Sequence, residues 1–273
     1  MKLRRLFLPP TLDSDRMVTS WFLSPWFLTV FRAILAMYTT AVFWGGFIDL
    51  AIHTPDQAGS YWYYFTNLSY LGLSMYLVLV TFGSGAHAWK GWLPGQMVQV
   101  PVHLLYATVL VSHVVTPVTF YALLFSPNDT FDRPALAWGN YSKHGGDLAV
   151  VLLEILVNRQ ELYWSDLPIT LLVAIVYMCW MFLVHAFANV WTYAFLGWDK
   201  GPQVAKWYIV MLVIFLAAFA IMWVIHWGKQ WLLGRLKRRG DQGKSPWQRE
   251  SVKVEGWGSL GGDRRDYQLP HWT

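Results

Sequence analysis

The sequence predicts an all-α integral membrane protein, a bundle of six transmembrane helices with both termini in the cytoplasm. Of its 273 residues, 55% are hydrophobic and only 14% are charged, whereas about 25% are charged in an ordinary soluble domain. Five long stretches lack Asp, Glu, Lys and Arg, and basic residues gather at the two ends of the chain. This composition excludes a water-soluble globule.

The charge-free stretches locate the spanning helices, because a helix that crosses a bilayer needs about 20 predominantly apolar residues. These stretches are residues 33–48, 57–89, 91–128, 167–198 and 207–228. We expect helices at residues 26–52, 61–82, 98–125, 144–158, 167–189 and 205–233. Aromatic clusters at residues 21–26, 61–64, 89–92 and 223–231 mark helix ends, where tryptophan and tyrosine rings prefer the membrane interface.

The fourth expected helix, residues 144–158, is short and contains His144, Asp147 and Glu154. Charged residues at the bilayer centre cost about 2.5–3.5 kcal/mol each on an insertion scale, so hydropathy alone does not identify this helix. The positive-inside rule supports it, because both ends of the chain are basic and belong in the cytoplasm. Two cytoplasmic ends require an even number of crossings, which the fourth helix completes.

This topology divides the chain into three parts. They are a cytoplasmic N-terminal segment (residues 1–25), a six-helix transmembrane domain (26–233) and a disordered, basic cytoplasmic tail (234–273). Arg235 and residues 237–239 form a basic cluster suited to anionic lipid headgroups. No nucleic-acid-binding module accompanies the net charge of +5, so we expect no nucleic acid partner. Sequons at Asn128 and Asn140 fall in or beside the longest expected external loop, which supports the orientation.

The polar residues inside the expected helices are the candidates for chemistry. The chain has no GxSxG, HExxH or P-loop motif and a single cysteine, Cys179, so we expect neither a metal nor a cofactor. Polar side chains within a membrane usually face the bundle interior. Five of them share one leaflet in the expected topology: Asp49, His53, Thr66, His144 and His185. Glu154 follows His144 by ten residues, about 15 Å deeper along a helix.

Each candidate also has an ordinary structural interpretation. A threonine in a membrane helix most often bonds the carbonyl one turn back, here that of Trp62. His144 and His185 are suited to interfacial or interhelical contacts, and Asp49 at the membrane boundary is expected to be solvated. The remaining buried histidines are interpreted as packing or interface residues: His103, His113 and His226.

Four short motifs occur in an informative order. Residues 62–66 read WYYFT, and Trp138, Asn140 and His144 form W-x-N-x-x-x-H with Glu154 ten residues later. Residues 184–196 contain VH followed by W-x-Y-x-F-L. Over residues 33–231 this pattern resembles the androgen-induced and androgen-dependent TFPI-regulating proteins, a family of multi-pass membrane hydrolases with fungal relatives. The chain departs from that family at Ala194, where the family has proline, and in its polar tail.

The resemblance implies that Thr66 is a nucleophile, that His144 is its catalytic partner, and that the substrates are fatty acid esters of hydroxy fatty acids. Elementary chemistry agrees, since a threonine hydroxyl needs a base to take its proton and an imidazole serves near neutral pH. If His144 opens a helix, the positive end of the dipole favours its neutral form. Asn67 or Asn140 would donate to the oxyanion. Three residues are candidates to orient His144: Asp49, Asp147 and His185.

We therefore expect a threonine hydrolase that takes its lipid ester from the bilayer, with no obligate protein partner, in the endoplasmic reticulum, another endomembrane or the plasma membrane. An alternative is a small transporter or channel with a proton or ion relay. That relay would consist of Asp49, His144, Asp147, Glu154 and His185. A third interpretation is a scaffold whose basic tail recruits partners.

Overall fold

Five long apolar helices dominate the computed structural model, which describes residues 12–126 and 133–242, with side chains described up to residue 236. They are α3 (Pro25–His53), α4 (Phe65–Lys90), α5 (Gln96–Thr119), α8 (Leu167–Ala188) and α9 (Ala205–Gln242). Each belongs to a segment that is long and apolar enough to cross a membrane. The only strand-like pairing in the described part of the chain is an isolated bridge between Ser20 and Asn158. The all-helical prediction is confirmed, and the helices are those of a membrane protein.

The fourth expected helix is the C-terminal part of a longer helical segment. It consists of α6 (Pro134–Tyr141), the π-helix η3 (Ser142–Gly146) and α7 (Asp147–Val157), which follow one another without a break. The prediction that His144 opens a helix is therefore wrong. His144 lies in the middle of this segment, away from its N-terminus. The helix dipole therefore does not favour the neutral form of the His144 ring.

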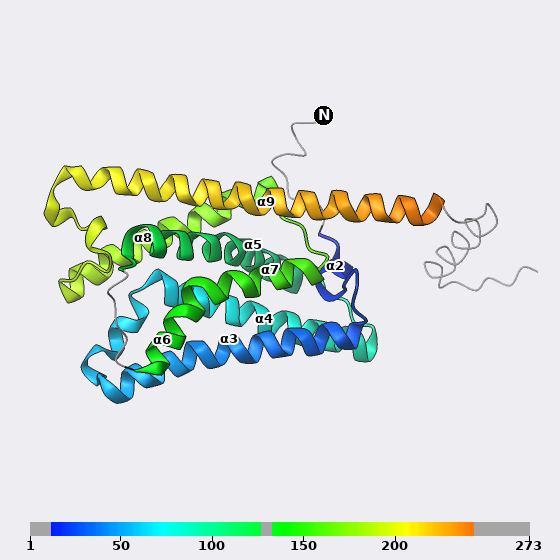
Figure 1. Cartoon of the computed structure of the whole chain (residues 1–273), viewed down its shortest axis with the longest axis horizontal. Helices are drawn as coiled ribbons and strands as arrows, with labels where there is room; N and C mark the ends of the chain where they lie inside the picture. The colour runs from blue at the N-terminus through cyan, green and yellow to red at the C-terminus, as the bar shows by residue number, and fades with distance from the viewer. Residues whose placement is uncertain (1–11, 127–132, 243–273) are drawn as a thin grey trace, which may run out of the picture. The chain divides into compact units, whose positions relative to one another are not determined.

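Short elements connect the long ones. They are α2 (Ser14–Val18), the 3₁₀ helices η1 (Pro55–Trp62), η4 (Trp164–Asp166), η5 (Ala194–Leu196), η6 (Trp198–Lys200) and η7 (Pro202–Val204), and the π-helix η2 (Phe120–Leu124). α3 and α4 pack side by side, and η1 joins them at the end of the bundle where α6 also lies (Figure 1). The second helix was expected from residue 61, but the chain leaves η1 at Trp62 and α4 begins at Phe65.

Helix ends follow local backbone preferences. Pro25 occupies the first turn of α3, where its missing N–H costs nothing. Gly91 ends α4 at φ 65°, a left-handed conformation that glycine adopts without penalty. Asn189 ends α8 at φ 55°, and asparagine is among the side chains that tolerate this region. Pro117 interrupts the hydrogen bonding of α5 just before η2.

The chain divides into two compact units after His226. α9 continues through this point and beyond Leu233, so residues 234–242 of the expected disordered tail are helical. In the second unit the Arg235 guanidinium lies over the Trp231 ring, 3.8 Å from its centroid. Residues 243–273 and the Asn128 sequon lie outside the described residues.

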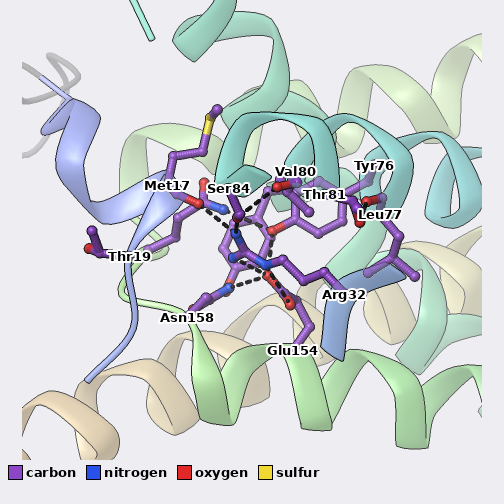
Figure 2. Close-up of polar contacts among 12 residues, drawn as sticks. Met17, Thr19, Arg32, Tyr76, Leu77, Val80, Thr81, Ser84, Glu154 and Asn158 are labelled. Carbon is purple, nitrogen blue, oxygen red and sulfur yellow. Dashed lines mark hydrogen bonds and ion pairs between the residues drawn. The ribbon is translucent and has the colours of Figure 1, made fainter. Parts of the chain in front are cut away.

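A buried ion pair joins α3 to α7 in the core. Arg32 is 0% exposed and Glu154 2%. The guanidinium donates from Nη2 to Glu154 Oε1 at 2.6 Å and from Nε to Oε2 at 3.2 Å, an arrangement that satisfies both carboxylate oxygens. Arg32 Nη1 donates to the Met17 carbonyl at 2.9 Å and to Ser84 Oγ at 2.5 Å (Figure 2).

The same carboxylate collects further donors. Tyr76 donates its hydroxyl to Glu154 Oε1 at 3.0 Å, and Asn158 donates its amide at 3.3 Å. Gln160 in turn donates to the Tyr76 oxygen at 2.8 Å. Glu154 is thus a structural residue inside the bundle, and its ion-pair partner is Arg32, which the sequence analysis did not single out.

We predict that Glu154→Ala lowers the free energy of unfolding by about 3–5 kcal/mol, because it leaves the Arg32 charge buried without a counter-ion. Thermal unfolding of the purified protein in detergent measures the loss. The control is the double variant Arg32→Met with Glu154→Leu, which removes both charges and should recover most of the stability. Equal losses in the single and double variants would contradict this account.

Candidate functional site

Two adjoining cavities meet at the start of α4 and at η3. The first, called here the apolar cavity, measures about 200 Å³ and is bounded by α4, α5, α8 and α9. Its apolar lining includes Phe65, Val115, Ile175, Met178, Met211 and Phe215. The second, called the polar chamber, measures about 440 Å³. Its polar lining includes Asp49, Tyr61, Asn67, Asn140, Lys143 and Thr192.

Thr66 and His144 line both cavities. The other residues common to the two linings are Phe120, Leu124 and Tyr193. Within the described residues, no hydrogen bond joins the Thr66 hydroxyl directly to the His144 ring. The structure therefore brings the two side chains to one boundary between an apolar and a polar space, without pairing them.

Thr66 lies in the first turn of α4, where backbone N–H groups have no partner within the helix. The Tyr193 hydroxyl lies beside this first turn. It lies close to the Thr66 side chain and to the backbone N–H groups of Phe65 and Thr66. The carbonyl of Trp62, the expected acceptor for Thr66, instead accepts the indole N–H of Trp180 at 3.0 Å. Within the described residues, no hydrogen bond joins the Thr66 hydroxyl to that carbonyl, so the ordinary interpretation of this threonine does not hold.

His144 is held by ring stacking. Its imidazole lies parallel to the Phe120 ring, with centroids 3.8 Å apart and an interplanar angle of 9°. Both residues come from π-helices, Phe120 from η2 and His144 from η3, and such segments occur frequently at functional sites. His144 Nδ1 is buried and has no hydrogen-bond partner among the described residues, so it is available to a ligand.

The two asparagines proposed as oxyanion donors differ. Asn67 is engaged at both ends of its amide, since Nδ2 donates to the Tyr61 carbonyl at 2.8 Å and Oδ1 accepts from Lys143 at 2.9 Å. Asn140 lines the polar chamber, and its amide makes no hydrogen bond within the described part of the chain. Of the pair, Asn140 is the residue with a free amide.

The Asp147 carboxyl pairs with His113 and not with His144. It is 0% exposed, and its Oδ2 lies 2.8 Å from His113 Nδ1. His113 Nε2 faces the Ser69 carbonyl at 3.2 Å. His113, interpreted from the sequence as a packing or interface residue, lies between α5 and α7 and forms a buried hydrogen-bonded pair with the Asp147 carboxyl.

The remaining candidates lie apart from the Thr66–His144 boundary. His185 stacks on Trp191, with ring centroids 3.9 Å apart, and lines neither cavity. Asp49 reaches the polar chamber but accepts from Arg133 at 2.9 Å and lies 3.3 Å from His53. Its side chain is 14% exposed, so it is not the solvated residue that we expected.

Two site residues escaped the sequence argument. Tyr193 belongs to a quoted motif, yet its contact with Thr66 joins residues more than 120 positions apart. Lys143 falls just before the helix expected at residues 144–158, yet it is buried, at 8% exposure. Within the described residues, no group of three or more His, Cys, Asp and Glu side chains is arranged to hold a metal ion.

Comparison with protein-family models, curated proteins and solved structures finds no match to this chain. Functional assignment therefore rests on the two cavities and on the side chains that line them.

Proposed function

We propose that the protein is a membrane-embedded ester hydrolase in which Thr66 is the nucleophile and His144 the general base. The observation that carries this proposal is that both side chains line the same two cavities. The motif resemblance to the androgen-induced protein family supports it and suggests fatty acid esters of hydroxy fatty acids as substrates. An ester of this class offers an alkyl chain for the apolar cavity and a polar bond for the boundary.

The proposed reaction has two steps. His144 takes the Thr66 hydroxyl proton as Oγ1 attacks the ester carbonyl, and the same proton is then given to the departing alcohol. Water next attacks the acyl-threonine with His144 again as base, which releases the carboxylic acid and restores the hydroxyl. The absence of a direct Thr66–His144 hydrogen bond does not exclude this role, because such bonds often tighten only when substrate binds.

The negative oxygen of the tetrahedral intermediate needs hydrogen-bond donors. The Tyr193 hydroxyl and the first-turn N–H groups of α4 lie beside Thr66, where an oxyanion would replace the Tyr193 oxygen at those N–H groups, and Asn140 lines the same chamber. The positive end of the α4 dipole favours negative charge at this point. These groups are the proposed oxyanion donors, while Asn67 holds Lys143.

The proposed membrane arrangement has six crossings. The α6–η3–α7 segment spans residues 134–157 and would supply the sixth crossing, with both chain ends in the cytoplasm. A lipid ester would enter the apolar cavity from the bilayer, since α8 and α9 border this cavity and expose apolar side chains. The α9 end with Trp231 and Arg235 would contact anionic headgroups. The home membrane is proposed to be the endoplasmic reticulum, another endomembrane or the plasma membrane.

The transporter alternative receives less support from the contacts. A relay requires its polar groups to lie within reach of one another. Asp147 instead bonds His113, Glu154 bonds Arg32, and His185 stacks on Trp191. Proton flux into vesicles without any ester hydrolysis would revive this alternative.

We predict that a fluorophosphonate probe labels Thr66, and that Thr66→Ala and His144→Ala each reduce ester hydrolysis on the order of 10³-fold or more. Labelling of the full-length protein followed by peptide mapping identifies the residue, and hydrolysis is measured in parallel. Thr66→Ser should retain a hydroxyl nucleophile and part of the activity.

The matched control is Thr81→Ala. Thr81 is also on α4, but its hydroxyl donates to the Leu77 carbonyl at 2.6 Å, so its loss should leave labelling and hydrolysis unchanged. Full activity in Thr66→Ala, at normal membrane expression, would end the proposed mechanism.

A further prediction concerns Asp147. Asp147→Ala should lower the melting temperature, because His113 loses its buried partner, while kcat changes by less than about tenfold since the carboxyl does not contact His144. Had Asp147 oriented the base, kcat would fall by about 10⁴ with little change in melting temperature, as when the carboxylate of a catalytic triad is replaced. Thermal unfolding and kinetics on the same preparation separate the two outcomes.

A further inference from the structure

The side chain of Lys143 forms an unusual buried contact. The residue is almost enclosed, at 8% exposure, and both hydrogen-bond partners of its ammonium are neutral. Nζ donates to the Tyr61 hydroxyl oxygen at 2.8 Å and to Asn67 Oδ1 at 2.9 Å. It also lies 4.5 Å from the centroid of the Tyr61 ring, a distance at which a ring face attracts a cation.

These partners are fixed by their own hydrogen bonds. Tyr61 donates its hydroxyl to the Phe43 carbonyl at 2.7 Å, and burial raises the pKa of Tyr61, so the hydroxyl keeps its proton. Asn67 donates Nδ2 to the Tyr61 carbonyl. Both residues therefore present oxygen lone pairs to Lys143, and the ammonium is positioned before any ligand arrives.

The backbone leaves room for this arrangement at Gly46 of α3. A Cβ atom at Gly46 would lie 3.1 Å from both Lys143 Nζ and the Tyr61 hydroxyl oxygen. That distance is shorter than an ordinary van der Waals contact, so a residue larger than glycine at position 46 would displace the Lys143 ammonium. The position of Lys143 thus depends on three separate elements, α3, η1 and α4.

What the ammonium lacks is a negative partner. Within the described residues, Lys143 forms no ion pair. Asp49 lines the same chamber, where its Oδ1 accepts from Arg133 at 2.9 Å and its buried Oδ2 has no hydrogen-bond partner among the described residues, but it does not reach Lys143. An ammonium has three N–H donors, and two are used by Tyr61 and Asn67. A buried charge without a counter-ion is costly, whereas an anion in the polar chamber would meet both the charge and the third donor.

We propose that Lys143 is the anion-binding residue of the polar chamber, and that its ligand is a carboxylate borne by a lipid whose alkyl chain lies in the apolar cavity. The two cavities share lining residues, so one amphiphile reaches both. A single ammonium, in a chamber that Asp49 also lines, suits one negative charge rather than the two of a phosphate monoester.

The inference deepens the proposed function and rests on it for the placement of the reacting ester at Thr66. It makes Lys143 a specificity-determining residue, which selects esters that carry a free carboxylate. Binding of such a ligand is measurable without any hydrolysis.

The test uses the full-length protein in neutral phosphatidylcholine nanodiscs and a photoreactive diazirine analogue of hexadecanoate. Unlabelled hexadecanoate, hexadecanol, hexadecyl phosphate and acetate compete with the probe. We expect hexadecanoate to compete at least tenfold better than the other three. Lys143→Met should abolish the preference for hexadecanoate over hexadecanol, and Lys143→Arg should retain part of it. The control Lys90→Met removes one exposed positive charge at the other end of α4 and should leave the preference intact.

Equal competition by acid and alcohol in the wild-type protein would overturn the inference, as would an unchanged preference in Lys143→Met. Stronger competition by hexadecyl phosphate would overturn the assignment to a carboxylate, and competition by acetate alone would overturn the assignment to a lipid. Failure of the proposed hydrolysis appears separately, as carboxylate binding that depends on Lys143 in a protein whose Thr66 is never labelled.

Discussion

The Arg32–Glu154 ion pair is the constraint on which the rest of the bundle depends. Neither charge is tolerable alone in an apolar interior, so α3 and α7 must meet at this point and in this register. Ser84 of α4 and the Met17 carbonyl complete the coordination of the guanidinium. The polar α6–η3–α7 segment is thereby held within the bundle despite a composition that hydropathy disfavours.

This anchoring explains how an otherwise apolar bundle carries a polar chamber. Glu154 sets the rotation of α7, Asp147 adds a second attachment to α5 through His113, and the preceding π-helix then carries Lys143 and His144 to the end of α4. Each attachment is a specific polar contact rather than hydrophobic packing alone. The two cavities therefore depend on contacts that lie well away from them.

The sequence predicted the long helices well, because apolar length and the absence of charge are sufficient signals for them. It also predicted that Thr66 and His144 lie at one end of the bundle, and their catalytic roles stay a prediction. It did not predict the π-helices, since a single extra residue per turn leaves no trace in hydropathy. For the same reason it did not predict that the Lys143 side chain is buried. It did not predict the Arg32–Glu154 ion pair, because a lone arginine in a sequence does not reveal its partner.

The stacking of His144 on Phe120 has a consequence for how this part of the chain tolerates change. Each ring is placed by a π-helical turn, whose hydrogen bonds join residues five apart rather than the four of an α-helix, and one residue of an α-helix corresponds to about 100° of rotation. Deleting a single amino acid from either turn would swing one ring away from the other while leaving composition and length almost untouched. Evolution can therefore exchange side chains around these rings far more easily than it can alter the spacing between them.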